Sequence, residues 1–205
     1  MKQINMDQGM NTLMKKYGNY LIFIILIIVC SMLSPAFLTV KNVTSVLRQI
    51  SITGILAFAE MLLIISGYID LSLGAVVAFS GMVSVNAYLS TGSYLMTFLT
   101  AITVAVICCS CSGFLVAKIK LPAFIAMDSI ARGACYMYTN GQPIYKIGDY
   151  GKISSGYIGP VPIPVVFLMV IAVIVWILLS KTTFGRNIYA IGGNQDAANA
   201  SGINV

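Results

Sequence analysis

Four charged side chains lie inside or beside long apolar stretches of the sequence, and these are the groups best placed to do chemistry: Glu60, Asp70, Asp128 and Arg132. A charge at the centre of a bilayer costs about 2.5 to 3.5 kcal/mol on insertion scales, so such groups should face protein or water. Asp128 precedes Arg132 by four residues, the better order for a helical ion pair, and we expect a structural pair there.

Glu60 has no partner on its own predicted helix, which leaves three alternatives. Its carboxylate pairs with an arginine on another helix, such as Arg48 or Arg132, or it is protonated, or it faces an aqueous cavity. Only the last alternative is directly functional. Glu60 and Asp128 would be the titrating groups if the protein were an ion-coupled or proton-coupled transporter.

Metal and redox chemistry find little support in the sequence. The chain contains no histidine, and its five cysteines all lie within apolar segments, so a zinc site lacks its usual ligands. We interpret the cysteines as small packing residues and expect no metal, no cofactor and no catalytic residue. An intramembrane enzyme is a remote alternative, because no serine stands in a motif with a base.

The composition excludes a water-soluble globule. Of 205 residues, 59% are hydrophobic and 9% are charged, whereas an ordinary soluble domain carries about 25% charge; the mean hydropathy is +0.92. Uncharged runs of 24, 47 and 28 residues lie between Lys16 and Lys41, between Asp70 and Lys118, and between Lys152 and Lys181. About 20 apolar residues suffice to cross a bilayer, so we predict a polytopic membrane protein.

The expected fold class is all-α, a bundle of about six spanning helices with a short helix in the C-terminal segment, because strands would leave unpaired backbone groups in lipid. The six predicted spans are Tyr20–Leu38, Ile50–Ile69, Leu71–Leu89, Tyr94–Ala117, Leu121–Thr139 and Ile163–Ser180. We treat residues 1–205 as one transmembrane domain. Its aqueous parts are an N-terminal segment at 1–18, a loop at 140–162 and a C-terminal segment at 181–205.

The basic residues predict the orientation. The net charge of +6 is carried mostly at the edges of apolar runs, which indicates topology signals and not nucleic-acid binding. One side of the membrane receives seven lysines and arginines: Lys2, Lys15, Lys16, Lys118, Lys120, Lys181 and Arg186. The other receives four: Lys41, Arg48, Lys146 and Lys152. Both termini and the 181–205 segment are therefore expected in the cytoplasm, and the 140–162 loop outside as an ordered connection.

Two polar segments interrupt the apolar pattern. In Ser66–Gly74 the chain must reverse between two spans, and we expect Asp70 to be the N-cap of the following helix, near a pathway or gate. In the C-terminal segment we expect Gly192 and Gly193 to break the chain, Asn194 to cap a short helix and Gly202 to end it. A helix of about two turns needs a partner surface for stability.

At this point the sequence resembles a known family, the inner-membrane permeases of bacterial ABC importers for ribose, xylose, galactose and similar sugars. Five segments in the family's order carry the resemblance: Ser34–Gln49, Gly67–Gly74, Ser129–Gly133, Tyr138–Tyr145 and Thr183–Val205. Two departures stand out. The segment Phe124–Arg132 is about three residues shorter than the family pattern, with Asp128 at the shortened place. Family members also run to roughly 300 residues, so the resemblance implies that the later membrane helices are absent from this chain.

The resemblance implies that the chain is a permease subunit in the inner membrane of a bacterium, importing a monosaccharide such as ribose. Its partners would be a cytoplasmic ATP-binding subunit, an extracytoplasmic sugar-binding protein and a second permease copy. The segment at Gly192–Val205 would seat in a cleft of the ATPase, and the expected coupling residues are Gly192, Gly193, Asn194, Ala197, Ala198, Ser201 and Gly202. The chain has no phosphate-binding loop of its own.

A neutral sugar is recognised by hydroxyl, amide and aromatic groups, so the polar residues near the second and third spans are candidates for the translocation pathway. They are Glu60, Asp70, Ser72, Ser80, Ser84 and Asn86. The alternative function remains an ion-coupled or proton-coupled secondary transporter that uses Glu60 and Asp128, which predicts uptake that depends on an ion gradient.

Overall fold

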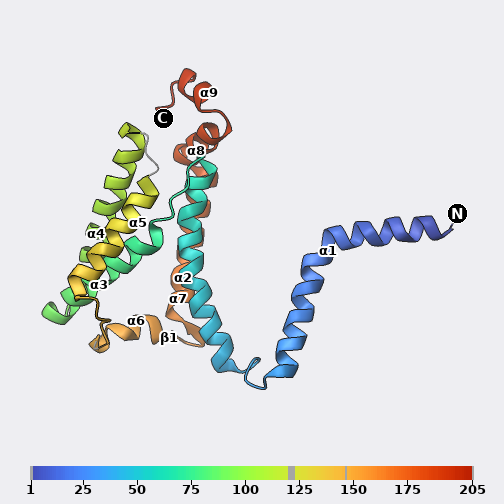
Figure 1. The fold of residues 1–205 in the computed structure, drawn as a ribbon, viewed down its shortest axis with the longest axis horizontal. Coiled ribbons are helices and arrows are strands. Elements are labelled where there is room, and N and C mark those ends of the chain that lie inside the picture. The colour runs from blue at the N-terminus through green and yellow to red at the C-terminus, as the bar shows by residue number, and fades with distance from the viewer. Residues whose placement is uncertain (1, 120–122, 146, 205) are drawn as a thin grey trace. The chain divides into compact units, whose positions relative to one another are not determined.

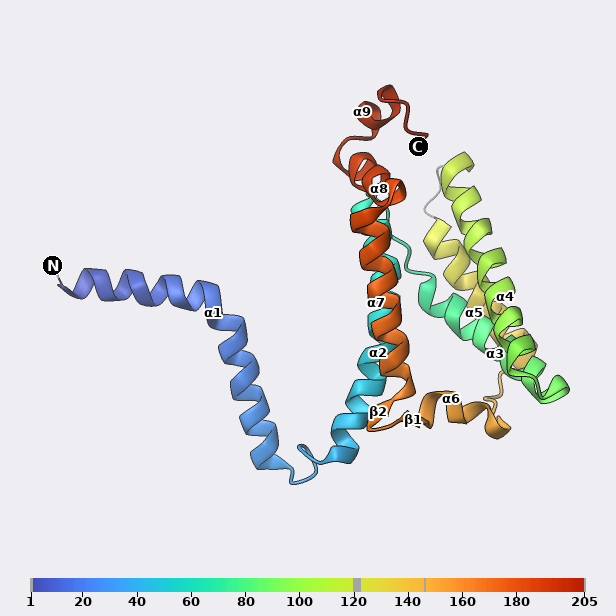
Figure 2. The ribbon, with the colours of Figure 1, turned by 180° about the vertical axis from the view of Figure 1, so that it is seen from behind.

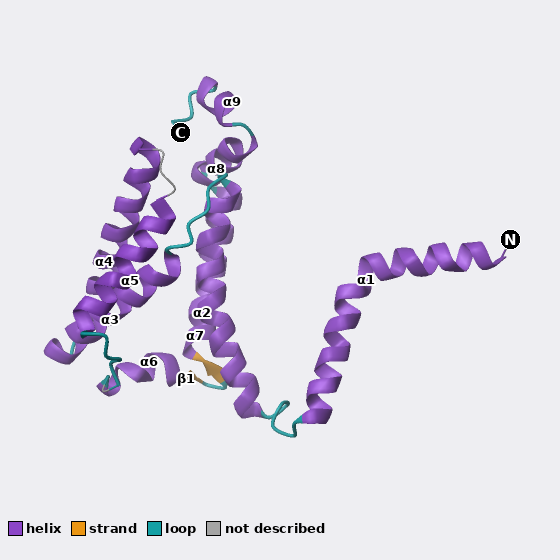
Figure 3. Cartoon of the chain, viewed as in Figure 1, coloured by secondary structure: helices purple, strands orange, loops and turns teal. Residues whose placement is uncertain are grey.

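The computed structural model describes residues 2–119, 123–145 and 147–204 (Figure 1). The chain divides into two compact units, Met1–Leu47 and Arg48–Val205, and each is described by itself. Nearly all of the regular structure in the described ranges is helical, and the strands are two residues long (Figure 3). The all-α class is therefore confirmed.

The first unit contains α1 (Lys2–Leu33) and the start of α2 (Val40–Ile65). α1 ends two residues before Pro35, because proline disfavours the helical conformation of the residue before it. The turn that follows is held by Asn42, whose Nδ2 donates to the Phe37 carbonyl oxygen at 2.7 Å. The predicted span to Leu38 was wrong at this end, and the apolar part of α1 is Tyr17–Leu33.

Four helices of the described residues are long and apolar enough to cross a membrane: α2, α3 (Leu73–Thr91), α4 (Tyr94–Phe114) with the π-helical turn that extends it to Lys118, and α7 (Ile163–Lys181). The other two predicted spans are shorter. α5 (Ala123–Thr139) has 17 residues, about 26 Å at 1.5 Å per residue, against about 30 Å of hydrocarbon. Leu121, where that span was expected to begin, lies outside the described residues.

The core of the second unit is built around α3, which packs against α4 and α5 (Figures 1 and 2). Its buried cluster consists of Ala75, Val76, Met127 and Ala131. Two of these side chains are alanines, and small residues let helices approach closely where lipid supplies no hydrophobic drive. Most other apolar side chains along the helices are exposed, as expected for surfaces that face lipid.

The connection between α5 and α7 contains short elements. They are a 3₁₀ turn (Gly148–Gly151), α6 (Lys152–Ser155), β1 (Tyr157–Ile158) and β2 (Val161–Pro162), and the two strands pair antiparallel. Asp149 and Lys152 form an exposed ion pair at 2.8 Å. The hydrogen bond from Lys152 to Asp149 raises the pKa of the lysine, so at alkaline pH the pair persists until the pH rises through that raised value.

Arg48 fastens this connection to α2. A guanidinium Nη donates to the Ser155 carbonyl oxygen at 2.7 Å, and the guanidinium carbon lies 4.7 Å from the centre of the Tyr157 ring. Arg48→Ala should lower the free energy of unfolding by about 1 to 3 kcal/mol, the usual cost of a charged hydrogen bond with a cation–π contact. Thermal unfolding in detergent measures this. Lys152→Ala, which removes only the exposed pair, should leave the transition nearly unchanged, and equal losses would contradict the assignment.

Candidate functional site

The C-terminal segment begins with a sharp turn between two helices. Lys181 ends α7, and Thr182 caps α8 (Thr183–Gly193) by accepting a hydrogen bond from the Gly185 amide at 3.2 Å. Gly185 is buried, and a Cβ there would collide with the carbonyl oxygens of Leu178 and Leu179. The close return of α8 onto the end of α7 therefore requires glycine at this position.

α8 continues through Gly192 and Gly193, so the prediction that these glycines break the segment was wrong. Neither glycine adopts a positive φ, and a helix accommodates glycine at a modest cost. Gly192 instead provides a close approach, because a Cβ there would collide with the carbonyl oxygen of Ile65 at the end of α2. A Cβ at Gly193 would meet nothing within 4 Å.

The break comes one residue later, at Asn194, which is extended and caps α9 (Gln195–Ala200). Its side-chain oxygen accepts from the Ala197 amide at 2.9 Å, which confirms the predicted cap. Gly202 has φ of 82° and follows the helix, while Ile203 N donates to the Ala198 carbonyl oxygen at 3.1 Å. This is the glycine C-cap that the sequence predicted.

α9 presents most of its surface outward. Ala198 is the inward-facing residue, with 4% of its surface exposed. Every other residue named for ATPase coupling is exposed: Gly192, Gly193, Asn194, Ala197, Ser201 and Gly202. The short helix therefore buries one alanine, and its outer face is exposed.

The α8–α9 segment also contacts the reversal between α2 and α3. Besides the approach of Gly192 to Ile65, the Gln195 side-chain nitrogen donates to the Tyr68 hydroxyl at 3.4 Å. These contacts join residues 127 positions apart in the sequence. Sequence reasoning singled out both segments but missed that they touch, because no local pattern encodes such a contact.

The reversal itself is held by the two acidic residues. α2 ends at Ile65, Gly67 follows it with φ of 88°, and Tyr68 N donates to the Leu63 carbonyl oxygen at 2.9 Å. Glu60 Oε1 accepts from the Asp70 amide at 3.2 Å, and Asp70 Oδ1 accepts from the Ser72 amide at 2.9 Å. The carboxylate of Asp70 thus bonds the expected amide. However, the N-cap position of α3 belongs to Ser72, so that part of the prediction was wrong.

Glu60 therefore finds its partner in the backbone and not in an arginine. The two groups that sequence reasoning proposed, Arg48 and Arg132, form their side-chain bonds elsewhere, to Ser155 and to Asp128. The second carboxylate oxygen of Glu60 is buried and has no hydrogen-bond partner among the described residues. Arg132 Nε lies 2.8 Å from Asp128 Oδ2, which confirms the predicted pair.

Of the polar residues predicted at and along α3, the three serines share a buried face and Asn86 lies apart from them. Ser72, Ser80 and Ser84 are buried, and Ser84 is 3.4 Å from the Tyr150 hydroxyl. Ser80 and Ser84 also donate to carbonyl oxygens of their own helix. Asn86 is exposed, two positions beyond Ser84 and so on a different face of the helix. Their role in a pathway stays a prediction.

The cysteines carry no metal site within the described ranges. Cys108 and Cys111 have the spacing of a CxxC pair, so the expectation that the sequence has no such pair was wrong, but both thiols are free. No group of three potential metal ligands of the histidine, cysteine, aspartate or glutamate type occurs among the residues that the structure describes.

Comparison with known proteins identifies the family. Residues 42–205 match the family described as "Branched-chain amino acid transport system / permease component". The chain belongs to this permease family. The matched range contains α3, α8, α9 and nearly all of α2, so it includes the reversal and the C-terminal segment described above.

Several curated relatives are sugar permeases. The ribose import permease protein RbsC of Bacillus subtilis (strain 168) is 37% identical over 94% of this chain and 62% of its own length. The D-allose transport system permease protein AlsC of Escherichia coli (strain K12) is 33% identical over 93% of this chain and 60% of its own. The L-arabinose permease protein AraH of the same strain is 33% identical over 93% and 59%.

The permease chain thus spans about 60% of the length of these relatives. They are transport permeases and not enzymes, and their names agree with the sugar-importer resemblance that the sequence motifs carry. No solved structure matches the chain.

Proposed function

We propose that this permease is the transmembrane subunit of an ATP-driven importer for a monosaccharide such as ribose. Relatives named for ribose, allose and arabinose transport support this substrate class. The four apolar helices among the described residues suit an inner-membrane location. The excess of basic residues on one side supports cytoplasmic termini, because positive charge favours the cytoplasm.

The partners follow from the division of labour in such an importer. A separate ATPase would supply the energy, since the sequence has no phosphate-binding loop. A sugar-binding protein would deliver substrate on the outer side, and a second permease copy would complete the pathway. The exposed face of α9 is the surface that we assign to the ATPase.

The observation that carries the proposal is the contact between the exposed α8–α9 segment and the α2–α3 reversal. Closure of the ATPase would push on α9, and Gly192 and Gln195 would pass the movement to Ile65 and Tyr68. The reversal is tied by Asp70 to Glu60, so the displacement would reach α2 and α3 as rigid rods. Such small shifts of packed elements are a common way to switch a transporter.

Uptake of labelled ribose into membrane vesicles tests this function. Vesicles from the native host should take up sugar only with ATP inside and binding protein outside, and a protonophore should leave uptake unchanged. Uptake that needs no ATP and collapses with the protonophore would refute the proposal.

Substitution of Glu60 distinguishes ATP-driven import from ion-coupled transport. The observation that favours ion-coupled transport is the buried Glu60 oxygen that has no hydrogen-bond partner among the described residues. Glu60→Gln keeps an acceptor for the Asp70 amide, so ATP-driven uptake should fall less than about twofold. Glu60→Ala removes the acceptor and should lower the free energy of unfolding by about 1 to 3 kcal/mol. If Glu60→Gln and Asp128→Asn both abolish uptake in stably folded protein, the ion-coupled alternative is supported instead.

A further inference from the structure

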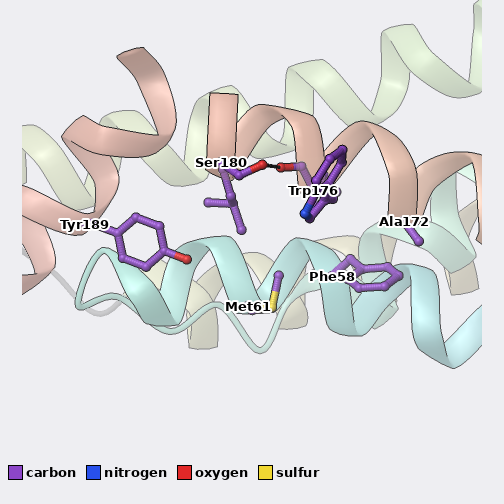
Figure 4. Close-up of a pocket in the computed structure, with 8 residues that line it drawn as sticks. Phe58, Met61, Ala172, Trp176, Ser180 and Tyr189 are labelled. Carbon is purple, nitrogen blue, oxygen red and sulfur yellow. Dashed lines mark hydrogen bonds between the residues drawn. The ribbon is translucent and has the colours of Figure 1, made fainter. Parts of the chain in front are cut away.

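An open groove lies between α2, α7 and α8, one helical turn from the contact of Gly192 with Ile65. Its volume is about 400 Å³, within the range of roughly 300 to 1,000 Å³ that is typical of ligand pockets. Phe58 and Met61 of α2 line one wall, and Trp176 and Ser180 of α7 line the other (Figure 4). Tyr189 of α8 closes one end, with its hydroxyl directed along the groove (Figure 4).

The groove is mostly apolar, and its polar side-chain groups are few: the Ser180 hydroxyl, the Tyr189 hydroxyl and the Trp176 indole N–H. The Ser180 hydroxyl donates to the Trp176 carbonyl oxygen within its own helix, so it is already satisfied. Among the residues that the structure describes, no acidic side chain lines the groove. The nearest acid in the sequence is Glu60, beside Met61, and its Oε1 bonds the Asp70 amide. The walls therefore suit a hydrocarbon chain better than a sugar.

Positive charge is placed at one end only. Lys181 Nζ lies 5.7 Å from the centre of the Trp176 ring, at the last residue of α7. Arg186 is exposed and precedes Tyr189 by three residues, so the two share a side of α8. Between Ala172, at the apolar end, and Lys181, α7 rises about 13 Å, which carries the groove from the hydrocarbon to the membrane surface.

This arrangement matches the layering of a bilayer leaflet. Tryptophan and tyrosine concentrate at the boundary between hydrocarbon and headgroups. In the groove, Trp176 lies near Lys181, and Tyr189 shares a side of α8 with Arg186. Basic residues at such a boundary attract anionic headgroups, each enriching them about fivefold. We propose that the groove binds an anionic glycerophospholipid, with an acyl chain between Phe58 and Trp176 and the phosphate at Lys181 and Arg186.

Trp176 is the only tryptophan in the sequence, so its fluorescence reports directly on the groove. The full chain is reconstituted in two sets of vesicles with equal lipid composition. In one set the phosphatidylglycerol carries brominated chains, and in the other the phosphatidylcholine does, at equal mole fraction. Bromine quenches fluorescence at contact. Brominated phosphatidylglycerol should therefore quench Trp176 with an apparent affinity at least about fivefold higher than that of brominated phosphatidylcholine.

Two variants separate binding from general attraction to the surface. Lys181→Gln with Arg186→Gln should remove the preference, whereas Lys152→Gln, which removes one exposed charge from the loop, should keep it. Ala172→Phe fills the apolar end and should reduce quenching by both lipids. Equal quenching of the unaltered chain in both sets would overturn the proposal. Weak quenching in both would also overturn it, because a second copy or another protein segment would then cover the groove.

Discussion

Gly192→Ala is expected to lower ATP-driven sugar uptake about tenfold or more while leaving the helices intact. The added Cβ would collide with the Ile65 carbonyl oxygen, which is backbone and cannot rotate away. α8 must then separate from the end of α2, and overpacking of this kind typically costs about 1 to 3 kcal/mol. The measurement is the initial rate of uptake, with the circular dichroism of the purified variant as the check on folding.

Gly193→Ala is the matched control. A Cβ at Gly193 meets nothing within 4 Å, and alanine favours a helix by about 1 kcal/mol relative to glycine. Uptake should therefore stay at the level of the unaltered protein. If the two variants behave alike, the contact between α8 and α2 carries no movement and the coupling route through Ile65 is wrong.

Ala197→Glu combined with Ala200→Glu is expected to release the ATPase subunit. Both alanines lie on the exposed part of α9, and glutamate is a good helix former, so the helix itself should persist. In an interface, however, two carboxylates would lose water without gaining partners, which typically costs several kcal/mol. Recovery of the ATPase with the affinity-tagged permease should fall about tenfold or more, measured by quantitative immunoblotting.

The corresponding serine variant tests whether charge and size are the cause. Ala197→Ser with Ala200→Ser keeps both side chains small and uncharged, and ATPase recovery should fall less than about twofold. Unchanged recovery with the glutamate variant would show that the outer face of α9 does not bind the ATPase.

The membrane class and several helix ends could be predicted from the sequence because they depend on local physics. Uncharged runs fix the approximate position of a spanning helix, and Asn194 and Gly202 act through capping or backbone conformation within a few residues. The end of α1 before Pro35 is just as local, but the predicted span ran past it to Leu38. The Asp128–Arg132 pair is equally local, since one helix positions both side chains. Such signals are readable without any knowledge of the tertiary structure.

The remaining features depend on contacts between distant segments. Gly192 looked like a helix breaker, but its function in the structure is the approach to Ile65, which no neighbouring residue indicates. Glu60 accepts a hydrogen bond from a backbone amide across the reversal, a partner that was not among the three alternatives left open by the sequence. Helical geometry alone separates Asn86 from the three serines. Which face of α3 is buried, however, is decided by its packing against α4 and α5.

Site-specific photo-crosslinking tests the central claim, that the outer face of α9 is where the ATPase engages this permease. A photoreactive residue at Ala200 is compared with one at Tyr145, which is 84% exposed in the connection predicted outside the membrane. The account predicts an adduct with the ATPase from Ala200 and none from Tyr145. An ATPase adduct from Tyr145, or labelling of Ala200 by a reagent confined to the outer side, would contradict it.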